Sequence, residues 1–147
     1  MRPHYDYDIA VVGSGPAGSR TAERLAMMGY SVALLERDPA PGHRVHCTGI
    51  VSDECFKAYS LPEESVLQSI ASFTLRSPQN RSTYVRRKSV QARVLDRVLL
   101  DRHLAKRATD AGARHITSTS VQDIDFDRKV VSLNMYTEGI HPVSYTH

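Results

Sequence analysis

The amino-acid sequence predicts an α/β fold built on a parallel β-sheet. Residues 9–12 form a short apolar run, rich in β-branched side chains, that leads directly into glycine. Residues 30–35 form a second apolar run, which ends at Glu36. Residues with helical spacing of small and apolar side chains lie between the two runs. A strand, a helix and a second strand in this order form a βαβ unit, whose strands are parallel and buried.

The composition excludes several classes of protein. The chain has 147 residues, of which 41% are hydrophobic and 24% charged, as in a globular domain. No apolar run approaches the roughly 18 residues of a membrane span, and the N-terminus lacks the apolar core of a signal peptide. We therefore expect a cytoplasmic protein. The two cysteines, Cys47 and Cys55, form no Cys-x-x-Cys pair, so neither a disulfide framework nor a metal site is predicted.

The remaining elements follow from periodicity, caps and turn residues. Helices are predicted at residues 19–28, 52–59 and 97–111. Ser52 caps the second helix and Asp96 the third. Gly29 ends the first helix and Gly112 the third. Proline and glycine make residues 37–49 a loop. Residues 61–64 are a helix start or turn. Strands are expected at 69–75, 82–85, 89–95, 113–117, 120–126 and 129–133, with turns at 77–80 and 127–128 and a small β-hairpin insertion.

The turn after the first strand carries the clearest chemical signal. It reads Gly13-Ser14-Gly15-Pro16-Ala17-Gly18, a Gly-x-Gly-x-x-Gly motif between a strand and a helix. In such a motif the first glycine allows the sharp turn, the second lets a pyrophosphate approach the backbone, and the third lets the helix pack on the sheet. The N–H groups at the helix N-terminus then attract phosphate. A glycine-rich turn that binds nothing is the alternative.

Glu36 completes this Rossmann-like dinucleotide-binding pattern. It ends the second strand, 18 residues after Gly18, where a carboxylate can accept hydrogen bonds from both ribose hydroxyls. Its negative charge also repels a 2′-phosphate, which disfavours NADP at this site. The pattern alone does not distinguish FAD from NAD.

Resemblance to known flavoproteins favours FAD. The sequence is similar to the N-terminal FAD fingerprint of the flavoprotein group that includes the aromatic hydroxylases, through Gly18, Ala22, Leu25, Gly29, Val32 and Glu36. Residues 41–52 resemble the Pro-Gly…Cys-x-Gly…Ser segment of the geranylgeranyl reductase family, and residues 97–113 resemble that family's second helix. Two positions depart from the family pattern, namely Leu100 in place of Phe and Thr48 in place of Gly.

The resemblance implies roles for individual residues. In that family FAD is the cofactor, and reduced FAD saturates isoprenoid double bonds. Gly13, Ser14, Gly15, Pro16, Ala17 and Gly18 would hold the pyrophosphate, Glu36 the ribose, Arg37 and Val121 the adenine, and Arg44, Cys47, Thr48, Gly49 and Arg97 the flavin side. The runner-up activity is that of a flavin-dependent monooxygenase or halogenase of the same superfamily. A non-catalytic fragment that binds a dinucleotide is the third alternative.

Cys47 is the candidate catalytic residue. Beside the flavin it would shape the substrate pocket or assist proton delivery to the reduced alkene. A free cysteine is also commonly a small buried hydrophobe, and that interpretation stays open. A redox thiolate would need a resolving partner, which Cys55 does not provide. The neighbouring His43 and His46 are expected to be surface loop residues.

Basic residues are concentrated in the middle of the chain. Residues 76–107 contain ten Lys or Arg but only two acids, Asp96 and Asp101. Such a segment is either a solvated basic face or a docking site for a phosphate-bearing substrate or an acidic electron donor. Nucleic acid is not expected, because no recognised binding motif accompanies the charge. The partners implied are an isoprenoid lipid, NAD(P)H or ferredoxin as electron donor, and peripheral membrane contact in the intact enzyme.

The chain is expected to be the N-terminal part of a longer protein. Residues 1–142 would form the first part of an FAD-binding domain, and the substrate domain would be absent. Residues 143–147, Val-Ser-Tyr-Thr-His, are what GTC-TCT-TAT-ACA-CAT encodes, which matches a transposon adapter used in sequencing libraries. We therefore predict that this tail is not native and exclude it from reasoning about the fold.

Overall fold

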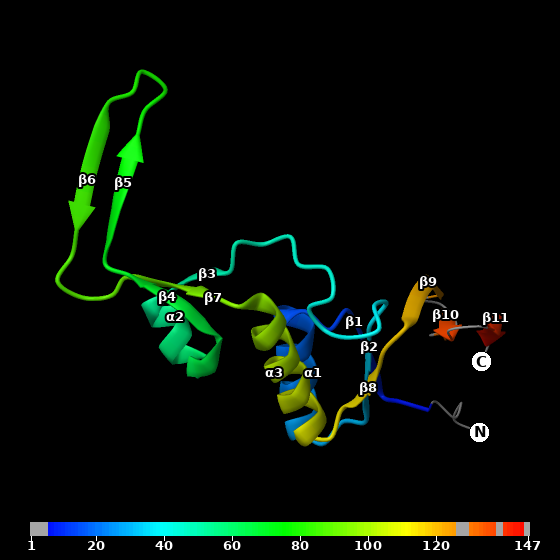
Figure 1. The fold of residues 1–147 in the computed structure, drawn as a ribbon. Helices are drawn as coiled ribbons and strands as arrows, with labels where there is room; N and C mark the ends of the chain where they lie inside the picture. The colour runs from blue at the N-terminus through cyan, green and yellow to red at the C-terminus, as the bar shows by residue number, and fades with distance from the viewer. Residues whose placement is uncertain (1–5, 126–129, 138–139, 146–147) are drawn as a thin grey trace. The chain divides into compact units, whose positions relative to one another are not determined.

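The computed structural model describes residues 6–125, 130–137 and 140–145, which Figure 1 traces from blue to red. Its contacts divide the chain into two compact units. The first unit comprises Met1–Arg44 and Asp101–His147, and the second comprises Val45–Leu100. Each unit is described by itself below.

The first unit contains the predicted βαβ arrangement. Strands β1 (Ile9–Val12) and β2 (Val32–Leu35) are parallel and are joined by helix α1 (Pro16–Met27). Strand β8 (Arg114–Ile116) lies parallel on the other side of β2, so the order is β1-β2-β8. This confirms the α/β fold with a parallel sheet. The central strand β2 is buried at all four positions.

Three further strands of this unit form an antiparallel sheet. They are β9 (Thr119–Asp125), β10 (Val130–Thr137) and β11 (Ile140–Tyr145), in the order β11-β10-β9. The first two fall where the sequence predicts strands, whereas no strand is predicted over residues 140–145. The turn predicted at 127–128 lies outside the described residues.

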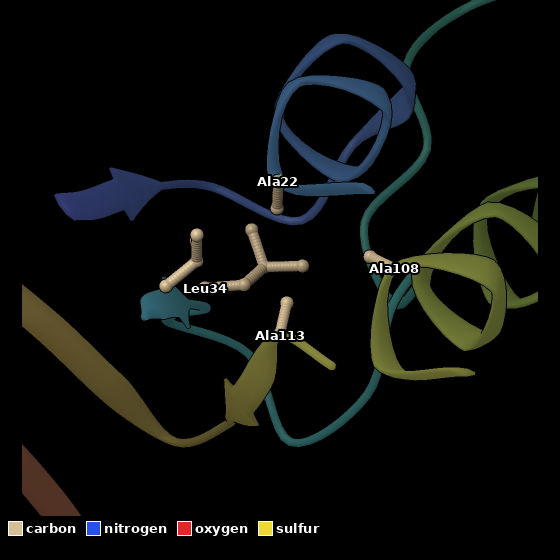
Figure 2. Packing of buried hydrophobic residues seen from close by; sticks show 5 residues of the cluster. Ala22, Leu34, Ala108 and Ala113 are labelled. Carbon is tan, nitrogen blue, oxygen red and sulfur yellow. The ribbon is translucent and has the colours of Figure 1, made fainter. Parts of the chain in front are cut away.

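Small side chains let the helices approach the sheet. Leu34 of β2 is fully buried and packs with Ala22 of α1, Ala113 and Val32. Ala108 joins this cluster from helix α3 (Arg97–Asp110), whose second half belongs to the first unit. Figure 2 shows the Leu34 side chain surrounded by the three alanines. Methyl groups on the helices therefore leave room for one large side chain from the sheet.

A buried carboxylate links α1 to α3. Glu23 is 6% exposed and accepts hydrogen bonds from Arg107 Nη2 at 2.8 Å and Nε at 3.1 Å. Arg20 Nη1 donates to its other oxygen at 2.6 Å. Burial raises the pKa of Glu23, but the hydrogen bonds and charges of the two arginines outweigh burial and hold the pKa below 4.5. The carboxylate is thus ionised in the neutral pH range.

The second unit is built from short strands and turns. Its three-stranded antiparallel sheet has the order β3-β7-β4, and its hairpin pairs β5 with β6. The elements are β3 (Ile50–Ser52), α2 (Asp53–Ala58), the 3-10 helix η1 (Glu63–Ser65), β4 (Val66–Ile70), β5 (Ser72–Arg76), β6 (Ser82–Arg86) and β7 (Ala92–Leu95).

Arg93 holds this unit together. Its guanidinium donates to Asp53 of α2 and to Glu63 of η1, both at 2.9 Å, and lies 4.2 Å from the centre of the Phe56 ring. The predicted cap of α2 is confirmed, because Ser52 Oγ accepts a hydrogen bond from Cys55 N at 3.0 Å.

Two predictions about strands are wrong. The single strand expected at residues 69–75 is divided into β4 and β5, because the chain changes partner at Ala71: β4 pairs with β7 and β5 with β6. The first strand is expected to be buried, yet Val12 is 53% exposed, because alternate side chains of β1 point away from the core that Val11 contacts. No helix of the described residues is long and apolar enough to cross a membrane.

We expect Leu34→Ala to lower the free energy of unfolding by about 2–5 kcal/mol, because it leaves a cavity at the centre of the core. The matched control is Leu67→Ala, since Leu67 is 67% exposed; it should change stability by less than about 0.5 kcal/mol. Urea unfolding of both variants measures the difference. Equal effects would contradict the assigned core.

We expect Glu23→Gln to destabilise the protein by about 1–3 kcal/mol at pH 7, because two partly buried guanidinium groups lose their charge partner. The folded-state pKa of Glu23 is lowered, so its contribution is fully present above pH 4.5 and is lost as the pH falls through the folded pKa. The gap between wild type and variant should therefore narrow in acid. Thermal melts across this pH range test the prediction, and a constant gap would refute it.

Candidate functional site

The glycine-rich turn joins β1 to α1 at the carboxyl edge of the parallel sheet. Gly13 has φ +93°, a conformation that favours glycine, and its N–H donates to Leu35 O at 2.7 Å. A Cβ on Gly18 would collide with the carbonyl oxygen of Gly13. Gly13 and Gly18 are therefore required by the turn itself, as the motif predicts.

Gly15 has a different reason to be glycine. It caps α1 with φ −68°, which any residue can adopt, and a Cβ there would meet no atom within 4 Å. Open space thus lies beside the N-terminus of α1, where Pro16 is the first residue and the next N–H groups have no partner within the helix. This space and these donors fit a phosphate group.

Glu36 lies beside the same turn. Its Oε2 accepts hydrogen bonds from Ser14 N at 2.8 Å and Ser14 Oγ at 2.9 Å, and its Oε1 accepts from Asp38 N at 2.9 Å. Burial raises the pKa of Glu36, but these hydrogen bonds, together with the charge interaction with His115, outweigh burial and lower it. Three of its roughly four acceptor positions are used, so room for about one further donor remains.

The loop after β2 contains a carboxylate that sequence reasoning missed. Asp38 is 6% exposed, and its Oδ1 forms ion pairs with Arg44 Nε at 3.2 Å and Arg37 Nε at 3.9 Å. The nearer contact has ion-pair distance without hydrogen-bond geometry. Two predicted cofactor-binding arginines are thus gathered around one buried acid. In the sequence, the position of Asp38 in a predicted loop did not indicate that its side chain is buried.

Strand β9 begins next to Glu36. Thr119 N donates to Glu36 O at 2.8 Å, and Ser118 N donates to Asp38 O at 3.0 Å. Val121, the residue predicted to contact adenine, is the third residue of β9 and is partly buried. The first unit therefore brings together the glycine turn, Glu36, the two loop arginines and the start of β9.

His115 is a second group that sequence reasoning missed. It pairs with Leu34 between β8 and β2, and its Nε2 is buried without a hydrogen-bond partner. Burial lowers the pKa of His115, and the nearby Glu36 carboxylate opposes this effect. The imidazole is therefore neutral at pH 7. In the sequence, only the position of His115 within the strand predicted at residues 113–117 indicated that its side chain could be buried.

Four of the five flavin-side residues belong to the second unit, whereas Arg44 belongs to the first. Gly49 has φ +71°, and a Cβ there would collide with Leu95 O and lie 3.3 Å from Arg97 Cγ. Gly49 O accepts a hydrogen bond from Leu95 N at 2.9 Å. The loop of Cys47, Thr48 and Gly49 is thereby held against the chain that leads into α3, beside Arg97. These four predicted site residues lie together.

Asp96 forms the start of α3, as predicted. Its Oδ1 accepts hydrogen bonds from Val98 N at 2.8 Å and Leu99 N at 3.1 Å. The cap fixes the first turn of the helix, which contains Arg97.

Cys47 is exposed, which overturns its interpretation as a buried hydrophobe. Its sulfur accepts a hydrogen bond from Gly49 N at 3.5 Å. His43 and His46 are exposed, as expected of loop histidines. Within residues 6–125 and the described parts of β10 and β11, no group of three His, Cys, Asp or Glu side chains could hold a metal ion.

Curated relatives confirm the resemblance to geranylgeranyl reductases. The chain is 37% identical over 128 residues to digeranylgeranylglycerophospholipid reductase 2 of Methanothermobacter thermautotrophicus. The aligned region covers 86% of this chain and 33% of the relative. The chain is 34% identical over 113 residues to geranylgeranyl diphosphate reductase of Rhodobacter capsulatus, covering 77% and 28%. The chain thus spans about a third of the length of these relatives.

Solved structures share the fold. A geranylgeranyl bacteriochlorophyll reductase-like protein from Thermoplasma acidophilum superposes with a TM-score of 0.81 at 21% identity, covering 94% of this chain and 36% of that one. A myxobacterial chondrochloren halogenase superposes with a TM-score of 0.69 at 20% identity, covering 94% and 35%. The Rossmann-like architecture expected from the sequence is confirmed.

A family model matches almost the whole chain. It is the model of the pyridine nucleotide-disulphide oxidoreductases, and it covers residues 7–145. The match includes β1, the glycine turn, Glu36 and the start of β9. The chain belongs to the pyridine nucleotide-disulphide oxidoreductase family.

Proposed function

We propose that this chain is the FAD-binding part of a flavin-dependent reductase that saturates isoprenoid double bonds. The observation that carries the cofactor proposal is the open space beside Gly15 at the N-terminus of α1, next to the half-buried Glu36. The pyrophosphate would occupy that space, and the remaining acceptor position of Glu36 would bind one ribose hydroxyl. We therefore propose that Glu36 binds one ribose hydroxyl, and not both as the sequence pattern predicts.

The remaining predicted residues keep the roles that the resemblance implies. Arg37 and Val121 would contact the adenine, while Arg44, Cys47, Thr48, Gly49 and Arg97 would lie on the flavin side. When bound, reduced FAD would supply a hydride to one alkene carbon, and a proton would reach the other. Exposure of Cys47 leaves its thiol accessible, which suits a role in pocket shape or proton delivery.

The isoprenoid substrate is proposed from the relatives. Those with 34–37% identity carry the names geranylgeranyl diphosphate reductase and digeranylgeranylglycerophospholipid reductase. The halogenase neighbours are only about 20% identical and support the fold alone. A halogenase of this fold has been solved in complex with FAD, in line with FAD as the cofactor. NAD(P)H or a ferredoxin would deliver the electrons.

We expect Gly15→Leu to weaken FAD binding at least about 10-fold, because the new side chain fills the space of the pyrophosphate. The backbone conformation of Gly15 suits any residue, so stability should fall by less than about 2 kcal/mol. Thr21→Leu, on the exposed face of α1, is the matched control and should bind FAD as the wild type does. Titration of the purified chain with FAD, followed by flavin fluorescence, measures the affinities. Unchanged binding by Gly15→Leu would place the cofactor elsewhere.

We also propose that residues 1–142 are native and that residues 143–147 are an adapter-derived tail. Sequencing the source DNA across the codons for Pro142 to His147 tests this, and we expect the reading frame to continue in native DNA. The longer product should then add hydrogen across the double bonds of a geranylgeranyl substrate when its FAD is reduced, as measured by mass spectrometry. A genuine stop codon after His147 would contradict the proposal that residues 143–147 are an adapter-derived tail. Alkene reduction by the 147-residue chain alone would contradict the proposal that the substrate domain lies outside it.

A further inference from the structure

We propose that Asp38 is a positioning residue, which holds Arg37 and Arg44 together so that their guanidinium groups bind the diphosphate of the cofactor. All three residues follow β2 in the first unit. Neither the dinucleotide-binding pattern nor the family resemblance gives Asp38 a role. The inference rests on the proposed function, because the diphosphate is that of FAD bound beside the glycine turn.

The backbone of Asp38 is fixed at both of its polar groups. Its N–H donates to Glu36 Oε1 at 2.9 Å, and its carbonyl oxygen accepts a hydrogen bond from Ser118 N at 3.0 Å. The other carboxylate oxygen of Glu36 is bonded to Ser14 in the glycine turn. The side chain of Asp38 therefore starts from a fixed point, which one hydrogen-bonded residue connects to the turn.

The carboxylate of Asp38 is buried and incompletely satisfied. Asp38 is 6% exposed, and its Oδ1 accepts no hydrogen bond within the part of the chain that the structure describes. A buried carboxylate is costly unless opposite charge lies close to it. Arg44 Nε at 3.2 Å and Arg37 Nε at 3.9 Å supply this charge. The buried acid thus attracts two guanidinium groups to one oxygen atom.

The two arginines depend on the same carboxylate. Both carry a positive charge, so they would repel each other if Asp38 did not lie between them. Among the described residues, neither side chain has another ion-pair or hydrogen-bond partner. An arginine side chain has many rotamers, and an anion binds more tightly to groups that are already held in place. Asp38 therefore supplies the order that the arginines lack by themselves.

A pair of guanidinium groups suits a diphosphate. Each guanidinium has more N–H donors than one carboxylate oxygen can accept, so donors remain for phosphate oxygens. The resemblance implies that Arg37 lies on the adenine side of the cofactor and Arg44 on the flavin side. The diphosphate joins these two halves of FAD. Two arginines that meet at one carboxylate therefore have the diphosphate as their common ligand.

We expect Asp38→Asn to weaken FAD binding at least about 5-fold, because the two arginines are no longer held. Charge attraction alone predicts the opposite result, since the variant removes a negative charge beside an anionic ligand. Titration of the 147-residue chain with FAD, followed by flavin fluorescence, measures the affinities. Unchanged or tighter binding by Asp38→Asn would overturn the proposal.

Asp110→Asn is the matched control. The Asp110 side chain is 61% exposed at the end of α3 and pairs with Lys106 at 2.6 Å. This variant therefore also removes one acid and one ion pair from the first unit, and it should bind FAD as the wild type does. Urea unfolding of both variants shows that they are folded. Equal loss of FAD affinity in both would overturn the assignment to Asp38.

A background without the arginines separates positioning from support of the loop. In R37Q/R44Q no guanidinium remains to be held, so adding D38N should weaken FAD binding no further and should remove a repulsive charge. A residue that merely stabilises the loop would weaken binding in both backgrounds. Equal weakening by D38N with and without the arginines would overturn the positioning role.

Competition tests the diphosphate and needs only the wild type and D38N. ADP contains a diphosphate, whereas adenosine does not. ADP should displace FAD from the wild type at a concentration at least about 10-fold lower than adenosine, and D38N should reduce this ratio at least about 3-fold. An unchanged ratio, or ADP that competes with FAD no better than adenosine, would overturn the proposal.

A measurement without cofactor tests the arginine contacts directly. Phenylglyoxal modifies guanidinium groups, and peptide mass spectrometry measures the rate at each arginine. D38N should make Arg37 and Arg44 react faster and leave Arg24, on the exposed face of α1, unchanged. Equal rates in the wild type and D38N at Arg37 and Arg44 would overturn the proposal.

Failure of this inference differs from failure of the proposed function. FAD binding that is equal in the wild type and D38N defeats this inference alone. A wild-type chain that does not bind FAD defeats the proposed function, and the inference that rests on it fails as well.

Discussion

The candidate site depends on how the carboxylate of Glu36 is held. Ser14 N, Ser14 Oγ and Asp38 N all donate to it, at 2.8–2.9 Å. These bonds join the turn after β1 to the loop after β2, which leave the same edge of the parallel sheet. A half-buried carboxylate is stable there only because its oxygens are satisfied. The turn, the loop and the direction of α1 are fixed together as a result.

The packing beneath this turn explains why the site can be small and rigid. Alanines on α1, on α3 and before β8 surround Leu34, so the helices lie close to the sheet. Glu23 adds charged hydrogen bonds between the same helices. A collision at Gly18 would push α1 away and move its N-terminus. The geometry that we propose for phosphate binding is therefore a consequence of close helix packing.

The two units contrast in where their polarity lies. In the first unit, acids are buried against arginines, Asp38 in the loop after β2 and Glu23 between α1 and α3. In the second unit, the partly buried Arg93 lies between Asp53 and Glu63, while most side chains of the β5–β6 hairpin are exposed.

Features governed by neighbours in the chain could be predicted from the sequence. The βαβ unit, the caps at Ser52 and Asp96 and the glycine turn follow from contacts within a few residues. The break at Ala71 could not be predicted, because β4 takes a distant partner, with Ile70 opposite Ala92, whereas β5 takes a near one, with Ser72 opposite Arg86. The burial of Asp38 and His115 likewise depends on distant parts of the chain, because Ser118 N bonds Asp38 O and His115 pairs with Leu34 of β2. Tertiary structure alone decided which side chains became buried and which, like Phe73, remained exposed, because burial is set by elements that meet only when the chain folds.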